Sequence, residues 1–149
     1  VESKRAKDAM VSWDQVSVLN QTDSLADITA TIVSSGHTRL PVLNSGQVIG
    51  LLHTKEFIAL LASAGTEWTQ LIRPVLTIEA KAPALGALRQ MQVRRTNLSI
   101  VLGANQEPIG ILTLEDVIEE IVGELFDEDD DGKVRRLLSI EAKLRTAKR

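Results

Sequence analysis

The spacing of hydrophobic residues changes along the chain from the period of a helix to that of a strand, and it does so twice. Residues 24–35 place their apolar side chains on one helical face, and Ser24 is a favourable N-cap residue. Two short β-rich runs follow, over 40–43 and 47–52. The Asn-Ser-Gly sequence between them, residues 44–46, predicts a hairpin, because Asn and Gly tolerate positive φ. The apolar helical positions are Leu25, Ile28, Ile32 and Val33.

A helix over residues 55–63 is predicted next, with Thr54 as its cap. The second half of the chain repeats the same order after a short connecting helix near 66–72. Each unit is therefore predicted to be β-α-β-β-α. The predicted elements of the second unit are a strand near 75–78, a helix near 84–93, a hairpin over 98–102 and 108–112, and a helix over 114–123.

Matching residues show that the two units are an internal duplication. Residues 48–52 correspond to residues 108–112, with Gly50 aligned on Gly110, and Thr38 aligns with Thr96. This alignment puts Asn97 at the position of Arg39. One unit alone has a three-stranded sheet that two helices only partly cover. Two units packed pseudo-symmetrically bury the rest, so we expect an α+β globule.

Composition excludes several classes of function. The chain has 149 residues, 44% of them hydrophobic, and no Cys, so disulfide frameworks and thiol nucleophiles are absent. The chain has only two histidines, His37 and His53, which leaves little for a metal centre or a His-based triad. The formal net charge of −3 argues against a nucleic-acid partner. No phosphate-binding loop or nucleophile elbow occurs, and we therefore predict that the chain is not an enzyme.

Two motifs carry a resemblance to a known family. The sequence of residues 110–124, Gly-Ile-Leu-Thr-Leu-Glu-Asp-Val-Ile-Glu-Glu-Ile-Val-Gly-Glu, closely resembles the second CBS repeat of the CorC/HlyC/CNNM family. These are hemolysin-like membrane proteins implicated in magnesium and cobalt transport. Residues 36–42, Gly-His-Thr-Arg-Leu-Pro-Val, resemble the first repeat of that family. The resemblance implies a tandem CBS pair, or Bateman module.

The resemblance also implies an organisation and a setting. We expect the first CBS repeat at 8–65, the second at 66–126, and an acidic linker with a basic C-terminal helix over 127–149. In this family such a module forms a homodimer. The resemblance implies that it regulates a transmembrane domain of the same full-length protein, and we expect it at the cytoplasmic face of a bacterial inner membrane.

The ligand that the resemblance implies is an adenine nucleotide, ATP or AMP, with or without Mg²⁺, in the cleft between the repeats. Asp116 can accept from a ribose diol. Thr113 stands at a helix start that attracts phosphate, and Arg39 offers a forked donor to phosphate oxygens. Adenine would lie between apolar strand residues. The site residues implied in this way are Thr38, Arg39, Leu40, Pro41, Ile78, Ile109, Thr113, Glu115 and Asp116.

The first repeat departs from this pattern. It has His53 and Glu56 where the second has Thr113 and Asp116, so we expect its own cleft to bind nucleotide poorly. A plainer interpretation makes Thr113 and Asp116 an N-cap and a first-turn acid, and Arg39 a partner of Glu56. The module would then be a structural dimerisation unit with degenerate clefts.

A third interpretation is a divalent-cation sensor in the acidic run. Asp127, Asp129 and Asp131 match the first positions of an EF-hand loop. The match fails at the twelfth position, where Leu138 replaces the bidentate Glu. These carboxylates are therefore weak metal candidates, and a solvated linker is the favoured interpretation.

Overall fold

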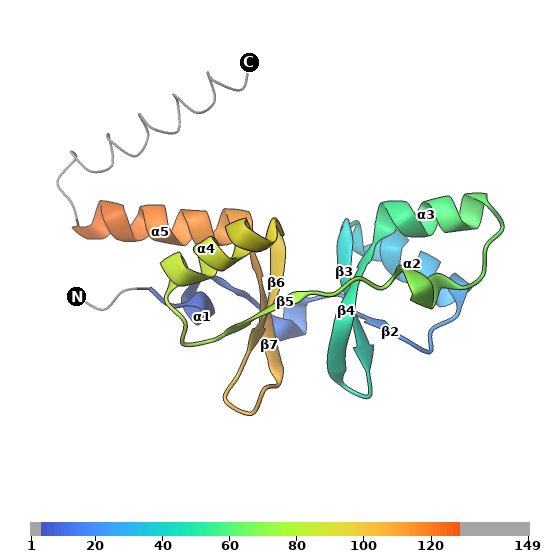
Figure 1. The fold of residues 1–149 in the computed structure, drawn as a ribbon, viewed down its shortest axis with the longest axis horizontal. Coiled ribbons are helices and arrows are strands. Elements are labelled where there is room, and N and C mark those ends of the chain that lie inside the picture. The colour runs from blue at the N-terminus through green and yellow to red at the C-terminus, as the bar shows by residue number, and fades with distance from the viewer. Residues whose placement is uncertain (1–3, 129–149) are drawn as a thin grey trace, which may run out of the picture.

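The computed structural model describes residues 4–128, and its α+β architecture is the predicted one. Two sheets stand side by side in the middle of the molecule, with the helices on their outer sides (Figure 1). The sheet of the first repeat has the strand order β2-β3-β4. The sheet of the second has the order β1-β7-β6-β5, in which β1 (Val11–Ser12) comes from the start of the chain. The elements of the first repeat are β2 (Leu19–Asn20), α2 (Leu25–Ser35), β3 (Arg39–Asn44), β4 (Gln47–His53) and α3 (Thr54–Ala62). Those of the second are β5 (Leu76–Glu79), α4 (Ala84–Arg94), β6 (Leu98–Leu102), β7 (Pro108–Thr113) and α5 (Leu114–Glu128).

The predicted order of elements is confirmed, with three local differences. Helix α5 continues to Glu128 rather than ending at residue 123. His53, not Thr54, is the N-cap of α3, and Thr54 is its first residue. In the first hairpin the positive φ angles fall on Ser45 and Gly46, 52° and 81°, rather than on Asn44, as a two-residue primed turn requires. Within residues 4–128 no helix combines the length and the hydropathy needed to cross a membrane.

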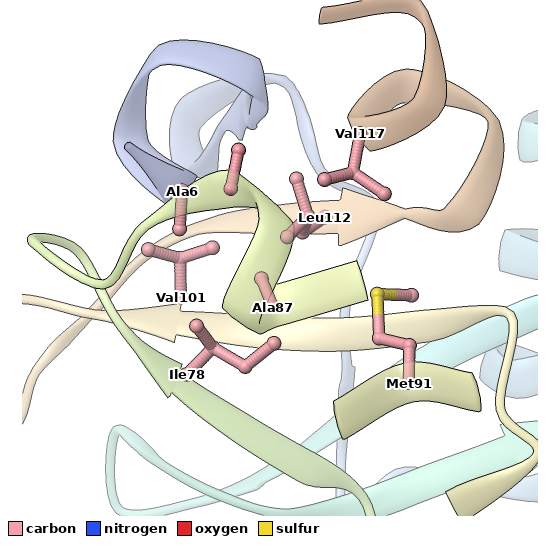
Figure 2. Close-up of a cluster of buried hydrophobic side chains, with 8 residues drawn as sticks. Ala6, Ile78, Ala87, Met91, Val101, Leu112 and Val117 are labelled. Carbon is pink, nitrogen blue, oxygen red and sulfur yellow. The ribbon is translucent and has the colours of Figure 1, made fainter. Parts of the chain in front are cut away.

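Each repeat has its own hydrophobic core between its sheet and its helices, and the low aromatic content leaves both cores mainly aliphatic. Figure 2 shows the core of the second repeat, to which Ala6 contributes from far away in the sequence. A third cluster, of Leu51, Leu98 and Ile100, is buried between the two sheets. The first core contains Leu19, Ile28, Leu40, Val42, Leu52, Phe57 and Trp68. The second contains Ala6, Ile78, Ala84, Ala87, Met91, Val101, Leu112 and Val117.

The segment that precedes each repeat pairs with the sheet of the other repeat. Residues 8–12, expected to belong to the first repeat, lie on the second. There β1 (Val11–Ser12) runs antiparallel to β7. Between the repeats, Arg73 forms a bridge with Leu51 of β4, with N–H···O distances of 2.9 Å in both directions. The remaining elements are α1 (Ala6–Ala9), η1 (Trp13–Gln15) and η2 (Trp68–Leu71).

The pairing of each preceding segment with the opposite repeat explains why both copies of the duplicated strand have a glycine, Gly50 in β4 and Gly110 in β7. A Cβ atom on Gly50 would collide with the carbonyl oxygen of Arg73. One on Gly110 would come within 2.6 Å of the carbonyl oxygen of Val11. The two glycines are therefore required by a backbone that crosses directly over them, and not by a turn.

The Gly110→Ala substitution is expected to lower the free energy of unfolding by about 1–3 kcal/mol, the usual cost of overpacking. Urea denaturation of the purified chain measures it. Gly86→Ala is the matched control, because Gly86 lies in α4 with open space around its Cα. That control should raise stability by about 0.5–1 kcal/mol. Equal effects of the two substitutions would contradict the crossing argument.

Candidate functional site

A cleft of about 480 Å³ lies between the two repeats. The first residues of β3 and the junction of β7 and α5 both line it. Both repeats and the segment before the first repeat therefore contribute to its walls. From the first part of the chain these residues are Val11, Gln15, Val16, Ser17, His37, Thr38, Arg39 and Pro41. From the second repeat they are Asn97, Leu98, Ile111, Thr113, Leu114 and Glu115.

Five of the nine nucleotide-site residues implied by the sequence come together in this cleft, although β3 and α5 are far apart along the chain. They are Thr38, Arg39, Pro41, Thr113 and Glu115.

The other four do not line the cleft. Leu40 is fully buried in the first core and Ile78 is 2% exposed in the second. Ile109 is half-buried and packs against the second core. Asp116 is half-buried one residue beyond Glu115.

Strand alternation and a bulge explain the positions of the apolar candidates. Successive side chains of a strand point to opposite faces, so Arg39 and Pro41 reach the cleft while Leu40 points into the core. In β7 the register shifts, because Val101 pairs with Gly110 and Leu102 with Pro108. Ile109 is left without a partner and its side chain is redirected away from the cleft. Ile111 is the β7 side chain in the apolar wall.

The start of α5 combines a structural role with the cleft. The Thr113 hydroxyl oxygen accepts a hydrogen bond from the backbone N–H of Asp116 at 3.2 Å, as an N-cap does. The N–H of Leu114 donates to the carbonyl oxygen of Asn97 at 3.0 Å. Two amides at this helix start are therefore already used. An anion here depends more on side-chain donors than on the free N–H groups of the helix.

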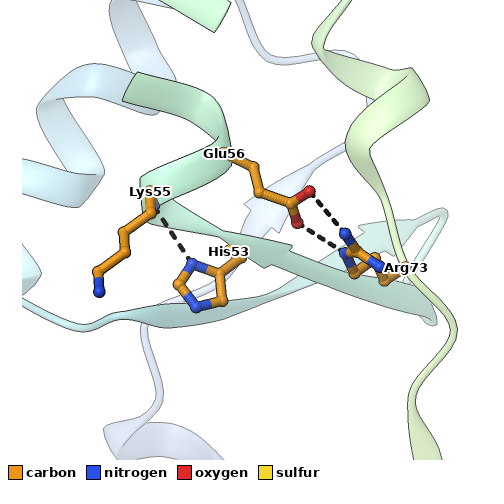
Figure 3. A network of polar contacts seen from close by, with 4 residues as sticks. All are labelled: His53, Lys55, Glu56 and Arg73. Atoms are coloured by element: carbon orange, nitrogen blue, oxygen red, sulfur yellow. Dashed lines mark hydrogen bonds and ion pairs between the residues drawn. The ribbon is translucent and has the colours of Figure 1, made fainter. Parts of the chain in front are cut away.

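The corresponding place in the first repeat holds an ion pair (Figure 3). The Arg73 guanidinium donates to both oxygens of Glu56, Nε to Oε1 at 2.6 Å and Nη2 to Oε2 at 2.7 Å. These hydrogen bonds, together with the positive charge of Arg73, lower the pKa of Glu56, although desolvation acts in the opposite direction. Glu56 is therefore paired with Arg73 rather than Arg39. Within residues 4–128 Arg39 forms no ion pair.

The structural register corrects the predicted counterpart of Arg39. The Thr38 carbonyl accepts from Thr54 N–H, as the Asn97 carbonyl accepts from Leu114 N–H. Thr38 and Asn97 are therefore equivalent, and the counterpart of Arg39 is Leu98, which is 6% exposed. The sequence alignment was one residue out because it matched two threonines. Because an arginine in one repeat is equivalent to a buried leucine in the other, the two halves of the interface differ chemically.

Sequence reasoning did not find the wall formed by Val11, Gln15, Val16 and Ser17. Nothing in these residue types indicates a site. The segment reaches the cleft only because it crosses from one repeat to the other.

Two residues of the predicted acidic run, Asp129 and Asp131, lie outside the described residues. Among residues 4–128 no three His, Asp or Glu side chains gather in a metal-binding cluster.

Comparison with known proteins gives two matches to one family model, described as the CBS domain, at residues 6–63 and 69–123. The UPF0053 protein MG146 of Mycoplasma genitalium is 33% identical over 129 residues, which are 84% of this chain and 30% of that protein. The magnesium and cobalt efflux protein CorC of Pasteurella multocida is 28% identical over 134 residues, 87% of this chain and 45% of that protein. The chain thus spans less than half the length of these relatives.

A solved structure has the same fold. The CBS domain of a bacterial CNNM/CorC family Mg²⁺ transporter in complex with ATP superposes with a TM-score of 0.70 at 24% identity. The match covers 82% of this chain and 89% of that one. At this identity the likeness establishes the fold alone.

The Glu56→Gln substitution should produce a pH-dependent loss of stability. Because the folded pKa of Glu56 lies below its ordinary value of 4.5, the ionised carboxylate stabilises the fold above that pH. This contribution is lost as the pH falls through the folded pKa. The stability difference between the unmodified chain and Glu56→Gln should therefore be present at pH 7 and vanish in acid.

Thermal unfolding at pH values from 3 to 7, at low salt, measures this difference. The pair is exposed, so we expect a small effect that salt reduces further. Glu67→Gln is the control, since Glu67 forms no ion pair among the described residues. A pH-independent difference for Glu56→Gln would show that the ion pair does not stabilise the fold.

Proposed function

Because this chain belongs to the CBS domain family, we propose that it binds an adenine nucleotide, ATP or AMP, in the cleft between its two repeats. The observation that carries the proposal is the cleft of about 480 Å³, in which Arg39, Thr38 and Thr113 meet an apolar wall. Its volume is within the roughly 300–1,000 Å³ typical of small-molecule sites.

The residues present fit the parts of such a ligand. Arg39 forms no ion pair among the described residues, so its guanidinium is available to phosphate oxygens. The Thr113 oxygen accepts from Asp116 N–H, which leaves its own hydroxyl proton to donate. Pro41 and Ile111 provide an apolar wall for the base. Asp116, half-buried just beyond the lining residues, is proposed to accept from the ribose hydroxyls.

The charges in the cleft bear on the form of the ligand. Glu115 lines the same cleft as Arg39, so a bound triphosphate faces a carboxylate as well as a guanidinium. Mg²⁺ on the phosphates would reduce that repulsion. We therefore propose that ATP binds more tightly with Mg²⁺, and that AMP, with fewer charges, depends on the cation less.

The role of binding is proposed to be regulatory rather than catalytic. Relatives of the chain include proteins named for magnesium and cobalt efflux, and a similar CBS domain from a Mg²⁺ transporter is known in complex with ATP. We infer that the chain is a module of such a transport protein, at the cytoplasmic face of the membrane and as a homodimer. Nucleotide between the repeats would shift their relative packing and so bias an attached transmembrane domain. This requires different affinities for the two arrangements.

One alternative has support from a specific observation. The Thr113 hydroxyl caps α5 and the Glu56–Arg73 pair occupies the equivalent region of the first repeat. Both features stabilise the fold without a nucleotide, as a purely structural dimerisation module would require. That alternative predicts dimers that form to the same extent with and without nucleotide.

Isothermal titration calorimetry of the chain with ATP, ADP and AMP, each with and without Mg²⁺, tests the proposal. Arg39→Met should weaken binding at least tenfold, since it removes a charge-assisted hydrogen bond to phosphate worth about 1.5–3 kcal/mol. Arg89→Met is the matched control, because Arg89 is exposed on α4 and does not line the cleft. It should leave binding unchanged.

Substitutions at α5 separate binding from folding. Thr113→Ile and Asp116→Ala should each weaken nucleotide binding, and Thr113→Ile should also lower stability by about 1 kcal/mol through loss of the N-cap. Melting temperatures without nucleotide report the second effect independently. Absence of saturable binding to any of the three nucleotides, in a folded chain, would overturn the proposal in favour of the structural module.

A further inference from the structure

The segment before the first repeat is anchored on the second repeat. Its backbone forms three hydrogen bonds there: Ala6 N–H to Ala82 O at 2.8 Å, Lys7 N–H to Ala80 O at 3.1 Å, and Ala84 N–H to Lys4 O at 2.8 Å. Side chains add the Arg5 Nη1 donor to Lys81 O at 2.9 Å and the Lys4–Glu120 pair at 3.5 Å. These contacts hold α1 against the loop before α4 and against α5.

The same segment then crosses to the first repeat and forms a wall of the cleft on the way. Val11 pairs with Ile111 of β7, and both line the cleft. Gln15, Val16 and Ser17 follow as lining residues. Leu19 then pairs with Val42 in the parallel β2–β3 ladder of the first repeat. Residues 4–17 are thus a strap that is fixed to one repeat, passes over the cleft, and enters the other.

The anchor of this strap is a very short helix. Helix α1 has four residues, and Ala6 is the one fully buried among them. A helix of this length does not hold itself together without tertiary contacts. Such an element belongs to the low-stability end of a structure, where local opening occurs without global unfolding. A ligand that contacts the strap can therefore bias the local opening of α1.

We propose that docking of α1 on the second repeat and ligand binding in the cleft are thermodynamically coupled, so that residues 4–9 control the affinity of a site they do not line. This inference rests on the proposed nucleotide site. Undocking of α1 frees the wall formed by residues 11–17, and a ligand that needs this wall must restore it. By reciprocity, a bound ligand must stabilise the docking of α1 by the same factor.

Hydrogen exchange on the unmodified chain tests the reciprocal effect. With saturating ATP and Mg²⁺, or AMP, the amides of Ala6 and Lys7 should exchange at least about fivefold more slowly, the lower end of usual couplings between sites. Their acceptors are backbone carbonyls in residues 80–82, not ligand atoms. The amide of Ile28, in the core of the first repeat, is the internal reference and should change less. Equal protection of all three amides would indicate global stabilisation and overturn the coupling.

A pair of matched substitutions tests the effect on affinity. Asp8→Ala removes the acceptor of the Arg5 N–H, at 2.7 Å, which starts α1. Ser24→Ala removes the acceptor of the Asp27 N–H, at 3.1 Å, which starts α2 away from the cleft. Both are exposed helix-start hydrogen bonds. Asp8→Ala should weaken nucleotide binding severalfold, whereas Ser24→Ala should leave it unchanged.

A variant that disrupts α1 docking more strongly should have a larger effect on nucleotide affinity. Ala6→Glu places a carboxylate at a fully buried position and should undock α1 with a larger loss of affinity. Where this variant does not fold, the Arg5→Ala/Asp8→Ala double substitution replaces it. Nucleotide binding that is unaffected by every α1 variant would overturn the coupling but leave the proposed function intact. No binding to the unmodified chain would overturn the proposed function itself.

Discussion

Burial of one sheet against the other is the constraint from which the rest of the structure follows. Leu51, Leu98 and Ile100 lie in the seam between the sheets and are shielded by neither repeat alone. At about 25 cal/mol per Å² of apolar surface, exposure of such a seam would be costly for a domain of marginal stability. The repeats must therefore pack together, and the cleft lies where their packed faces diverge.

The segments that precede the two repeats, each of which pairs with the sheet of the other repeat, make that packing specific. Each one adds backbone hydrogen bonds to the sheet of the opposite repeat, over Gly50 in one case and Gly110 in the other. Main-chain pairing fixes the register between repeats more tightly than apolar contact, which has no direction. The exchange also brings residues 11–17 to the cleft. One device thus holds the repeats together and completes the candidate site.

The two halves of the interface have diverged in charge while keeping one geometry. Thr113 and His53 both accept a backbone N–H at a helix start, so the capping function is retained with different chemistry. Arg39 and its counterpart Leu98 both line the cleft, but Leu98 is apolar and 6% exposed. Glu56 is neutralised by Arg73, a partner that the second repeat does not provide to Asp116, since Val11 stands at the equivalent place. The two repeats thus share one backbone geometry but differ in the polar side chains placed on it.

The sequence by itself determined the duplication, the β-α-β-β-α order and the resemblance to CBS repeats, which the family match confirms. These depend on local spacing of apolar residues and on contiguous motifs, and both are legible along the chain. It also singled out Arg39 and Thr113, because their motifs are local. Only the tertiary structure decided that Leu40 and Ile78 belong to the cores, that a bulge turns Ile109 aside, and that residues 11–17 form a wall of the cleft. The reason is physical: strand register, bulges and strand exchange depend on pairing between segments far apart in the sequence, and local patterns do not specify which segment will cross which.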